Sequence, residues 1–180
     1  MSDRIRRRQF PKRITLVDVA KDAGVSRATA SLVLRDSPLV TDETREKVLA
    51  SMQRLGYVYN RAAASLRTRR SQTIGLIITD ITNPFFAQMT VGSEAQAGEA
   101  NYAVLLSNTS DTLSKQDGLL ETMHEYAVDG VVLCPAMGTS PETIERLRRW
   151  RLPLVLVARY LFDIEVDYVG ADNVLGAEMA

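Results

Sequence analysis

The chain has 180 residues, 46% of them hydrophobic and 24% charged, an ordinary composition for one full folded domain with a smaller one beside it. It has no run of about 18 apolar residues that could span a membrane, and its basic N-terminus is not followed by the apolar stretch of a secretory signal. The single cysteine, Cys134, excludes an internal disulfide, and one histidine is too few for a usual zinc site. We therefore expect a cytoplasmic protein without a metal or cofactor.

The formal net charge of zero conceals an uneven distribution. Residues 1–70 hold 16 Lys and Arg against 7 Asp and Glu, whereas residues 71–180 hold 6 against 15. This asymmetry predicts a basic module that meets a polyanion, joined to an acidic module that does not. Residues 1–13 lack hydrophobic periodicity, which indicates either a disordered basic arm that attracts phosphates or a solubilising tail.

Residues 14–34 are typical of two short helices separated by a glycine turn. Thr15 and Ser26 are placed to cap the two helices, and Asp18 can return a hydrogen bond to the backbone of Thr15. Gly24 follows the last turn of the first helix, where the backbone needs a positive φ that glycine adopts cheaply.

The two helices have the small facing residues that a helix-turn-helix needs. Ala20 and Ala30 allow them to cross closely. The second helix is expected to present short, mostly polar side chains outward, namely Arg27, Ala28, Thr29, Ser31 and Leu32. Such side chains suit a groove of DNA better than a protein core, although a generic two-helix corner remains the alternative.

A third helix is expected between the cap Thr41 and Gly56, with an apolar stripe of Val48, Leu49, Met52 and Leu55. The resulting bundle buries little area, so it should be only marginally stable alone. Residues 62–67 have helical propensity but are too few to hold a helix unaided. Leu66 stands there among arginines, which suits insertion into a DNA minor groove. A plain interdomain linker explains the same residues.

From Thr73 the hydrophobic pattern changes to alternating apolar runs and helical stretches. The apolar runs are typical of strands buried on both faces and cover residues 74–79, 102–107, 131–134 and 154–157. The helical stretches between them cover residues 86–100, 112–126 and 140–150. A fifth short strand at 168–170 precedes a further helical pattern. This alternation predicts a parallel, doubly wound sheet.

In such a sheet, ligands bind beyond the carboxyl ends of the strands. Phe85 is expected on that rim and Phe86 toward the core, and the rim as a whole comprises Asp80 to Phe86, Ser107 to Asp111, Pro135 to Met137, and Arg159. The loop after the first strand has no glycine, which argues against a dinucleotide or phosphate loop. His124 and Asp129 lack a nucleophile partner, so we do not expect an enzyme.

The chain resembles the LacI family, the lactose-repressor type of bacterial transcriptional regulator, from about residue 14 to its end. The N-terminal motifs that carry the resemblance are residues 15–20, 23–26, 29–31 and 44–48, with Gly56, Tyr57 and Asn60. The later motifs, which resemble the family's core with its periplasmic sugar-binding fold, are residues 74–77, 80–86, 128–131 and 172–173.

The resemblance implies an N-terminal all-α helix-turn-helix bundle with a hinge helix, followed by an incomplete periplasmic-binding-protein-like α/β domain with a parallel sheet. The implied boundaries are a basic arm at 1–13, a DNA-binding domain at 14–59, a hinge helix and linker at 60–71, and a partial effector domain at 72–180. It also implies a homodimer that represses transcription from a near-palindromic double-stranded operator. A small sugar or nucleoside-like effector would change the hinge's ability to fold.

The resemblance further implies roles for individual residues. Arg27 and Ala28 would face bases, and Leu66 would open the minor groove beside Ala63 and Arg67. Leu16 is a further expected DNA contact, and phosphates would be held by Thr15, Ser26, Thr29, Ser31, Tyr57 and Asn60. Effector contacts would come from Asp80, Phe85, Phe86, Arg159 and Asp172.

Four residues depart from the family's pattern. Leu32 replaces a base-reading arginine, so that contact becomes apolar, and Arg35 replaces an asparagine and adds a phosphate contact. Tyr59 replaces a proline, so the approach to the hinge is less fixed. Ala158 replaces a ligand-contacting aspartate, which weakens the case for a sugar-type effector.

Family cores have a second subdomain that closes over the effector, and Ala180 falls inside its first helix. We therefore expect about half of the effector pocket, in either a fragment or a truncated relative that binds DNA without an effector response. A small-molecule-binding module with an incidental basic head is the alternative from another functional class.

Overall fold

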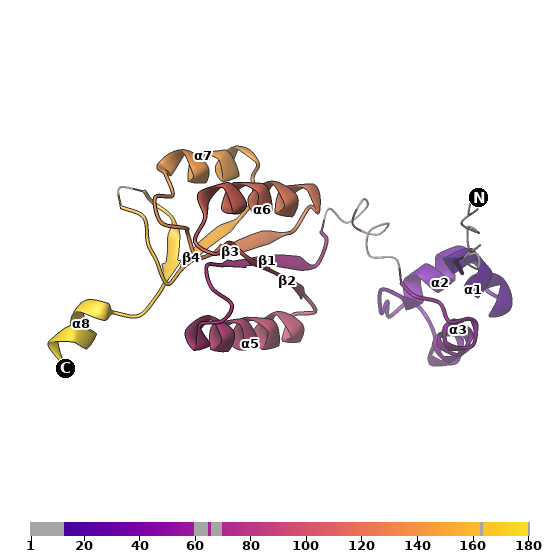
Figure 1. Cartoon of the computed structure of the whole chain (residues 1–180). Coiled ribbons are helices and arrows are strands. Elements are labelled where there is room, and N and C mark those ends of the chain that lie inside the picture. The colour runs from indigo at the N-terminus through magenta and orange to yellow at the C-terminus, as the bar shows by residue number, and fades with distance from the viewer. Residues whose placement is uncertain (1–12, 60–64, 66–69, 163, 180) are drawn as a thin grey trace, which may run out of the picture. The chain divides into compact units, whose positions relative to one another are not determined.

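The computed structural model describes residues 13–59, 65, 70–162 and 164–179, and the chain forms two compact units, residues 1–60 and 61–180 (Figure 1). The expected basic arm lies outside the described residues, apart from Arg13. The expected hinge helix also lies outside them except for Ser65, and so do Asn60, Ala63, Leu66 and Arg67.

The first unit is a bundle of three helices. These are α1 (Leu16–Asp22), α2 (Arg27–Val33) and α3 (Asp42–Leu55). The expected capping box is formed at α1, where Asp18 N donates to Thr15 Oγ1 at 3.4 Å and Thr15 N donates to Asp18 Oδ2 at 2.8 Å. Gly24 between α1 and α2 and Gly56 after α3 have φ angles of 68° and 64°, so both expected helix ends are confirmed.

The core of the first unit is small and is built from all three helices. Its buried members are Val19, Ala20, Ala30, Val33, Val40, Val48 and Met52. Buried Ser51 of α3 reinforces the packing on α1, because its hydroxyl lies 2.5 Å from Asp22 Oδ2 and 3.3 Å from Val19 O. Leu49, which the sequence pattern places on the apolar stripe of α3, is instead 50% exposed.

The second unit is a five-stranded parallel sheet with the strand order β2-β1-β3-β4-β5. Its strands are β1 (Thr73–Ile78), β2 (Ala103–Asn108), β3 (Gly130–Leu133), β4 (Leu154–Val157) and β5 (Asp167–Val169). Its helices are α5 (Pro84–Glu99), α6 (Leu113–Glu125), α7 (Pro141–Arg149) and α8 (Asn173–Glu178). Helix α5 covers one face of the sheet, and α6 and α7 cover the other (Figure 1).

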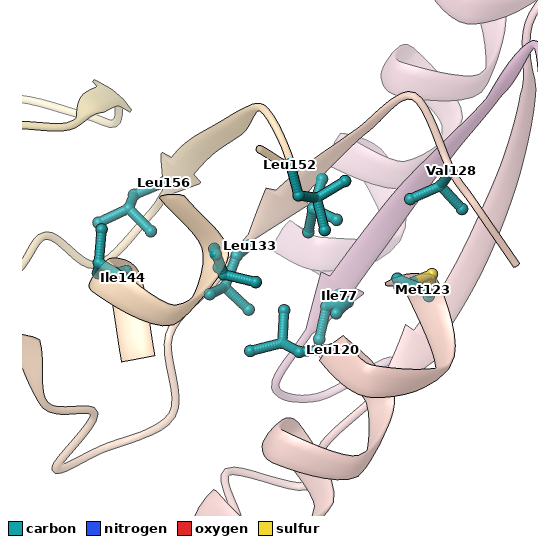
Figure 2. Close-up of a cluster of buried hydrophobic side chains, with 10 residues drawn as sticks. Ile77, Leu120, Met123, Val128, Leu133, Ile144, Leu152 and Leu156 are labelled. Carbon is teal, nitrogen blue, oxygen red and sulfur yellow. The ribbon is translucent and has the colours of Figure 1, made fainter. Parts of the chain in front are cut away.

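Most of the second unit's core lies between the sheet and the pair α6 and α7. Figure 2 shows Leu120 and Met123 of α6 beside Ile77 and Leu133 of the central strands. Gly75 of β1 permits this close approach, since a Cβ there would lie 2.8 Å from Met123 Sδ. On the other face, a smaller cluster is formed by Leu76, Ile78, Phe86, Cys134 and Val157.

Burial of the strands on both faces holds for the centre of the sheet but not for its edges. The residues of β2 are half-buried or exposed, and all three residues of β5 are exposed. Both strands have a neighbour on one side only, so fewer side chains cover them. No helix in the part of the chain described by the structure is long and apolar enough to span a membrane.

Candidate nucleic-acid interface and ligand cavity

The second helix of the bundle offers a short polar surface. Arg27 and Ala28 are exposed at its start, and Thr29 and Ser31 are half-buried. Leu32 is also half-buried and packs against the helical core, so part of its side chain remains available to a ligand. Just beyond the helix, exposed Arg35 donates from Nε to the backbone oxygen of Ser31 at 3.1 Å.

The hydroxyl groups at the starts of α1 and α2 serve as helix caps. Ser26 Oγ accepts from Thr29 N at 3.0 Å and lies 2.9 Å from Thr29 Oγ1. Thr15 Oγ1 donates to Asp18 Oδ2 at 2.6 Å, which uses its only hydrogen. Leu16, next to it, is half-buried against the core. The expected phosphate contact of Thr15 therefore requires its hydroxyl to leave Asp18.

The cations of the bundle divide into two groups. Every Lys and Arg of α3 forms an ion pair: Arg45 with Asp36, Lys47 with Glu43, and Arg54 with Asp22. By contrast, Lys21, Arg27 and Arg35 pair with no carboxylate among the described residues. The positive charge that the bundle can offer a polyanion is thus concentrated on α1, on α2 and on the residues directly after α2.

Tyr57 follows α3, is half-buried and packs against the helical core. Burial raises the pKa of its hydroxyl above the ordinary value of 10.0. The hydroxyl therefore stays protonated at neutral pH and can donate a hydrogen bond to a phosphate oxygen.

A cavity of about 640 Å³ lies at the carboxyl ends of the strands, where the order of a doubly wound sheet reverses. Four of the five expected effector residues line it, namely Asp80, Phe85, Phe86 and Arg159. Phe85 is 52% exposed and Phe86 8%, which confirms the expected rim and inward positions. Asp172 does not line the cavity; its carboxylate caps α8 through Leu175 N at 3.0 Å.

Arg159 and Asp111 join three loops at this cavity. Arg159 Nη1 donates to Asp111 Oδ1 at 2.8 Å and to the backbone oxygen of Pro135 at 2.6 Å. Asp111 Oδ1 also accepts from Met137 N at 2.8 Å. The pKa of Asp111 is lowered mainly by its hydrogen bond with the Arg159 guanidinium and secondly by the hydrogen bond from Met137 N.

The pKa values of two other groups that line the cavity, Asp80 and Cys134, are also shifted by their surroundings. Asp80 Oδ1 accepts from Thr82 Oγ1 at 2.6 Å and from Thr82 N at 2.9 Å, and these hydrogen bonds lower the pKa of Asp80. Cys134 is buried with its Sγ 3.9 Å from Thr79 Oγ1, and burial raises the pKa of its thiol. A thiol of this kind is protonated at neutral pH and unreactive.

Sequence reasoning identified the loops of the cavity but not all of its side chains. The residues absent from the expected effector set are Thr79, Asn83, Asn108, Ser110, Asp111, Cys134, Ala158, Ala171 and Asn173. Asn83, Asn108, Ser110 and Asp111 lie within the expected rim, and the usable signal for Asn108 was its place directly after an apolar run. Ala158, the departure from the family's pattern, lines the cavity with a left-handed φ of 62°.

The fold and the cavity define a class of two-unit proteins in which a helix-turn-helix bundle is joined to a periplasmic-binding-protein-like domain. Residues 15–60 match the family described as bacterial regulatory proteins, lacI family. Residues 71–179 match the periplasmic binding proteins and sugar binding domain of the LacI family. The chain therefore belongs to the LacI family.

Individual relatives agree with this assignment. The transcriptional regulator RegA of Clostridium acetobutylicum is 38% identical over 143 residues, which cover 79% of this chain and 42% of RegA. The maltose regulon regulatory protein MalI of Vibrio furnissii is 39% identical over 122 residues, which cover 68% of this chain and 89% of MalI. The Lac repressor dimer bound to operator and the anti-inducer ONPF has the same fold, with a TM-score of 0.76 and 23% identity over 93% of this chain and 52% of that one. The chain thus spans less than half the length of RegA.

Proposed function

We propose that this chain binds operator DNA as a homodimer and represses transcription without catalysing a reaction. The observation that carries the proposal is the division of cations in the bundle. Carboxylates neutralise those of α3, whereas Lys21, Arg27 and Arg35 pair with no carboxylate in the part of the chain that the structure describes. A further support is that a protein with this fold, the Lac repressor, is a dimer bound to operator. The basic residues that flank the bundle in the sequence add phosphate attraction.

The residues fall into three proposed roles on DNA. Arg27 and Ala28 face base edges in the major groove, and Leu32 offers its exposed part to a thymine methyl. The DNA backbone is held by Ser26, Thr29, Ser31, Arg35, Tyr57 and Asn60, with Thr15 and Leu16 beside them. In the linker, Leu66 opens the minor groove beside Ala63 and Arg67. The corresponding boundaries are 14–59 for DNA binding, 60–71 for the hinge and 72–180 for the effector domain.

The cavity of the second unit is the proposed site of a small effector. Its volume of about 640 Å³ falls in the range of small-molecule pockets, roughly 300–1,000 Å³. Its lining combines the aromatic rings of Phe85 and Phe86 with polar groups such as Asn108 and Arg159. This combination suits a sugar or a nucleoside, since both present an apolar face and several hydroxyls.

Selection of bound duplexes from a random pool with the full chain tests DNA recognition. We expect near-palindromic winners with a fixed half-site spacing, and binding whose log K falls by about 0.9 per phosphate contact per decade of salt. Equal, salt-insensitive binding to every duplex would contradict the proposal.

Two arginines of the bundle give a matched comparison on the selected operator. Arg27→Ala should weaken operator binding by about 1–3 kcal/mol and relax the preference at one base pair. Arg54→Ala removes the same charge from the paired group on α3 and should leave that preference unchanged. An equal loss from both variants would count against base recognition by Arg27.

The linker is tested separately. Leu66→Ala should weaken operator binding while the helical signal of the bundle stays unchanged. Full operator affinity in this variant would remove the minor-groove role.

A further inference from the structure

The second unit is acidic overall, yet its few cations are gathered in one place. Residues 71–180 contain six Lys and Arg, and four of these are arginines within residues 146–151. This cluster comprises the last turn of α7 and the residue pair that follows it.

Two of the four arginines are held by other groups of the second unit. Arg146 pairs with Asp117 and lies 5.4 Å from the Trp150 ring. Arg148 pairs with Glu145 at 2.5 Å and also donates to the backbone oxygen of Glu165. These two therefore have structural partners.

The other two arginines are exposed and uncommitted. Within the described ranges, neither Arg149 nor Arg151 makes an ion pair or a side-chain hydrogen bond. Arg151 has a left-handed φ of 55° directly after α7, with Arg151 N donating to Arg148 O and Leu152 N to Leu147 O. This is a helix-ending motif in which glycine is the cheapest residue at that position, so an arginine there costs conformational energy.

Arg151 also lies where the chain enters the second unit. Ser71, the residue directly after Arg70, donates a hydrogen bond from its backbone N–H to Asp129. Arg70 and Arg151 line one depression of about 450 Å³, together with His124 and Trp150. Ten residues, 61–70, join this end to the bundle, and they span at most about 36 Å when fully extended. The linker from the bundle therefore enters the second unit beside Arg151.

Compensation of the helix dipole is the ordinary explanation for arginines at a helix C-terminus. It accounts for Arg148 and Arg149 but not for Arg151, which follows the helix. The neighbouring α5 and α6 end at Glu99 and Glu125, so a basic end is not a general requirement of this sheet. The carboxylate that lines the depression with Arg151 is Asp129, which accepts hydrogen bonds from Ser71 and Gln72.

We propose that Arg149 and Arg151 form an auxiliary contact with the phosphate backbone of the duplex that the bundle binds. The inference rests on the proposed operator binding and extends the DNA interface to the second unit. Because phosphates carry no sequence information, the contact adds affinity and salt dependence but no base preference.

The test measures the affinity of the full chain for its selected operator over a range of salt concentrations. In the double variant Arg149→Ala, Arg151→Ala, the slope of log K against log salt should fall by about 0.9 for each arginine of each bound protomer. The ratio of operator to random-duplex affinity should stay the same. The variant Arg149→Lys, Arg151→Lys keeps the charge and should keep most of the slope.

Lys115→Ala supplies the charge-removal control for the double variant Arg149→Ala, Arg151→Ala. This substitution removes one charge from the opposite end of the second unit, where Lys115 Nζ donates to Ser110 Oγ at 3.2 Å. The slope of log K against log salt in this variant should equal that of the wild type. A slope that is unchanged in the double arginine variant, or lowered equally by Lys115→Ala, would overturn the auxiliary contact while operator binding by the wild type stands. Failure of the wild type to select any duplex would instead overturn the proposed function.

Discussion

The carboxylate of Asp129 accepts hydrogen bonds from the backbone N–H of Ser71 at 2.7 Å and from its hydroxyl at 3.1 Å. The same carboxylate accepts from Gln72 N at 3.1 Å. Three donors from the start of the second unit thus converge on one side chain beside β3. Asp129 thereby fixes the point at which the interdomain linker becomes part of the sheet.

Replacing Asp129 should loosen this attachment. Asp129→Ala removes three hydrogen bonds to a charged acceptor, and we expect the second unit to lose about 1–3 kcal/mol of unfolding free energy. Urea unfolding followed by the fluorescence of Trp150, the single tryptophan, measures this loss. Asp167→Ala removes an exposed aspartate of β5 and should change the stability by less than about 0.5 kcal/mol. Equal effects of the two substitutions would show that Asp129 does not anchor the linker.

The Arg159–Asp111 pair predicts a pH dependence with a defined sign. The pKa of Asp111 is lower in the folded protein than its ordinary value of 3.8, so its contribution to stability is present above that value and is lost as the pH falls through the folded pKa. Because both side chains are more than a third exposed, we expect this contribution to stay below about 1 kcal/mol.

Asp111→Asn tests this pH dependence. The difference in unfolding free energy between wild type and variant should be constant from neutral pH down to mildly acidic pH, and should shrink toward zero in strong acid. A difference that grows on acidification would contradict the assignment.

Cys134 should report the integrity of the second unit. Its thiol is buried and its pKa is raised, so modification by a thiol reagent at neutral pH requires the unit to open. We expect labelling of the native protein to be far slower than labelling in concentrated urea. Since Cys134 is the only cysteine, the signal has one source. Native labelling as fast as that of a free thiol would show that the cavity wall is open.

Gln116 of α6 should stabilise the loop after β3, which carries the Pro135 oxygen next to the cavity. It is fully buried, its Oε1 accepts from Ala136 N at 2.7 Å, and its Nε2 donates to Thr139 Oγ1 at 3.0 Å. Gln116→Leu leaves the buried Ala136 N–H without its acceptor, which should cost about 1–3 kcal/mol in a thermal or urea unfolding experiment. The variant should also bind an effector more weakly, because the loop it holds carries the Pro135 oxygen that orients Arg159.

Gln88→Leu is the control for Gln116→Leu. Gln88 is exposed on α5, so the same chemical change there should leave stability within about 0.5 kcal/mol of the wild type. If both variants lose a comparable amount of unfolding free energy, the cause is a change in helix propensity or surface and not the loss of the buried Gln116 amide.

The sequence by itself determined the elements and their ends, because these depend on neighbouring residues. Thr15, Ser26 and Thr41 cap helices as predicted, Gly24 and Gly56 end them, and the helices and strands of the second unit begin and end within about two residues of the predicted bounds. The order of apolar runs and helices was also sufficient to predict a parallel sheet and a cavity at the carboxyl ends of its strands.

Only the tertiary structure decided which side chains meet. Asp111 and Arg159, which are 48 positions apart in the sequence, come into contact because β2 and β4 lie on either side of the pair β1 and β3. No local pattern encodes this strand order. The exposure of Leu49, the edge positions of β2 and β5, and the capping role of Asp172 were decided in the same way. Strand order and helix packing depend on contacts between residues far apart in the chain, whereas caps and periodicity depend on residues within one or two turns.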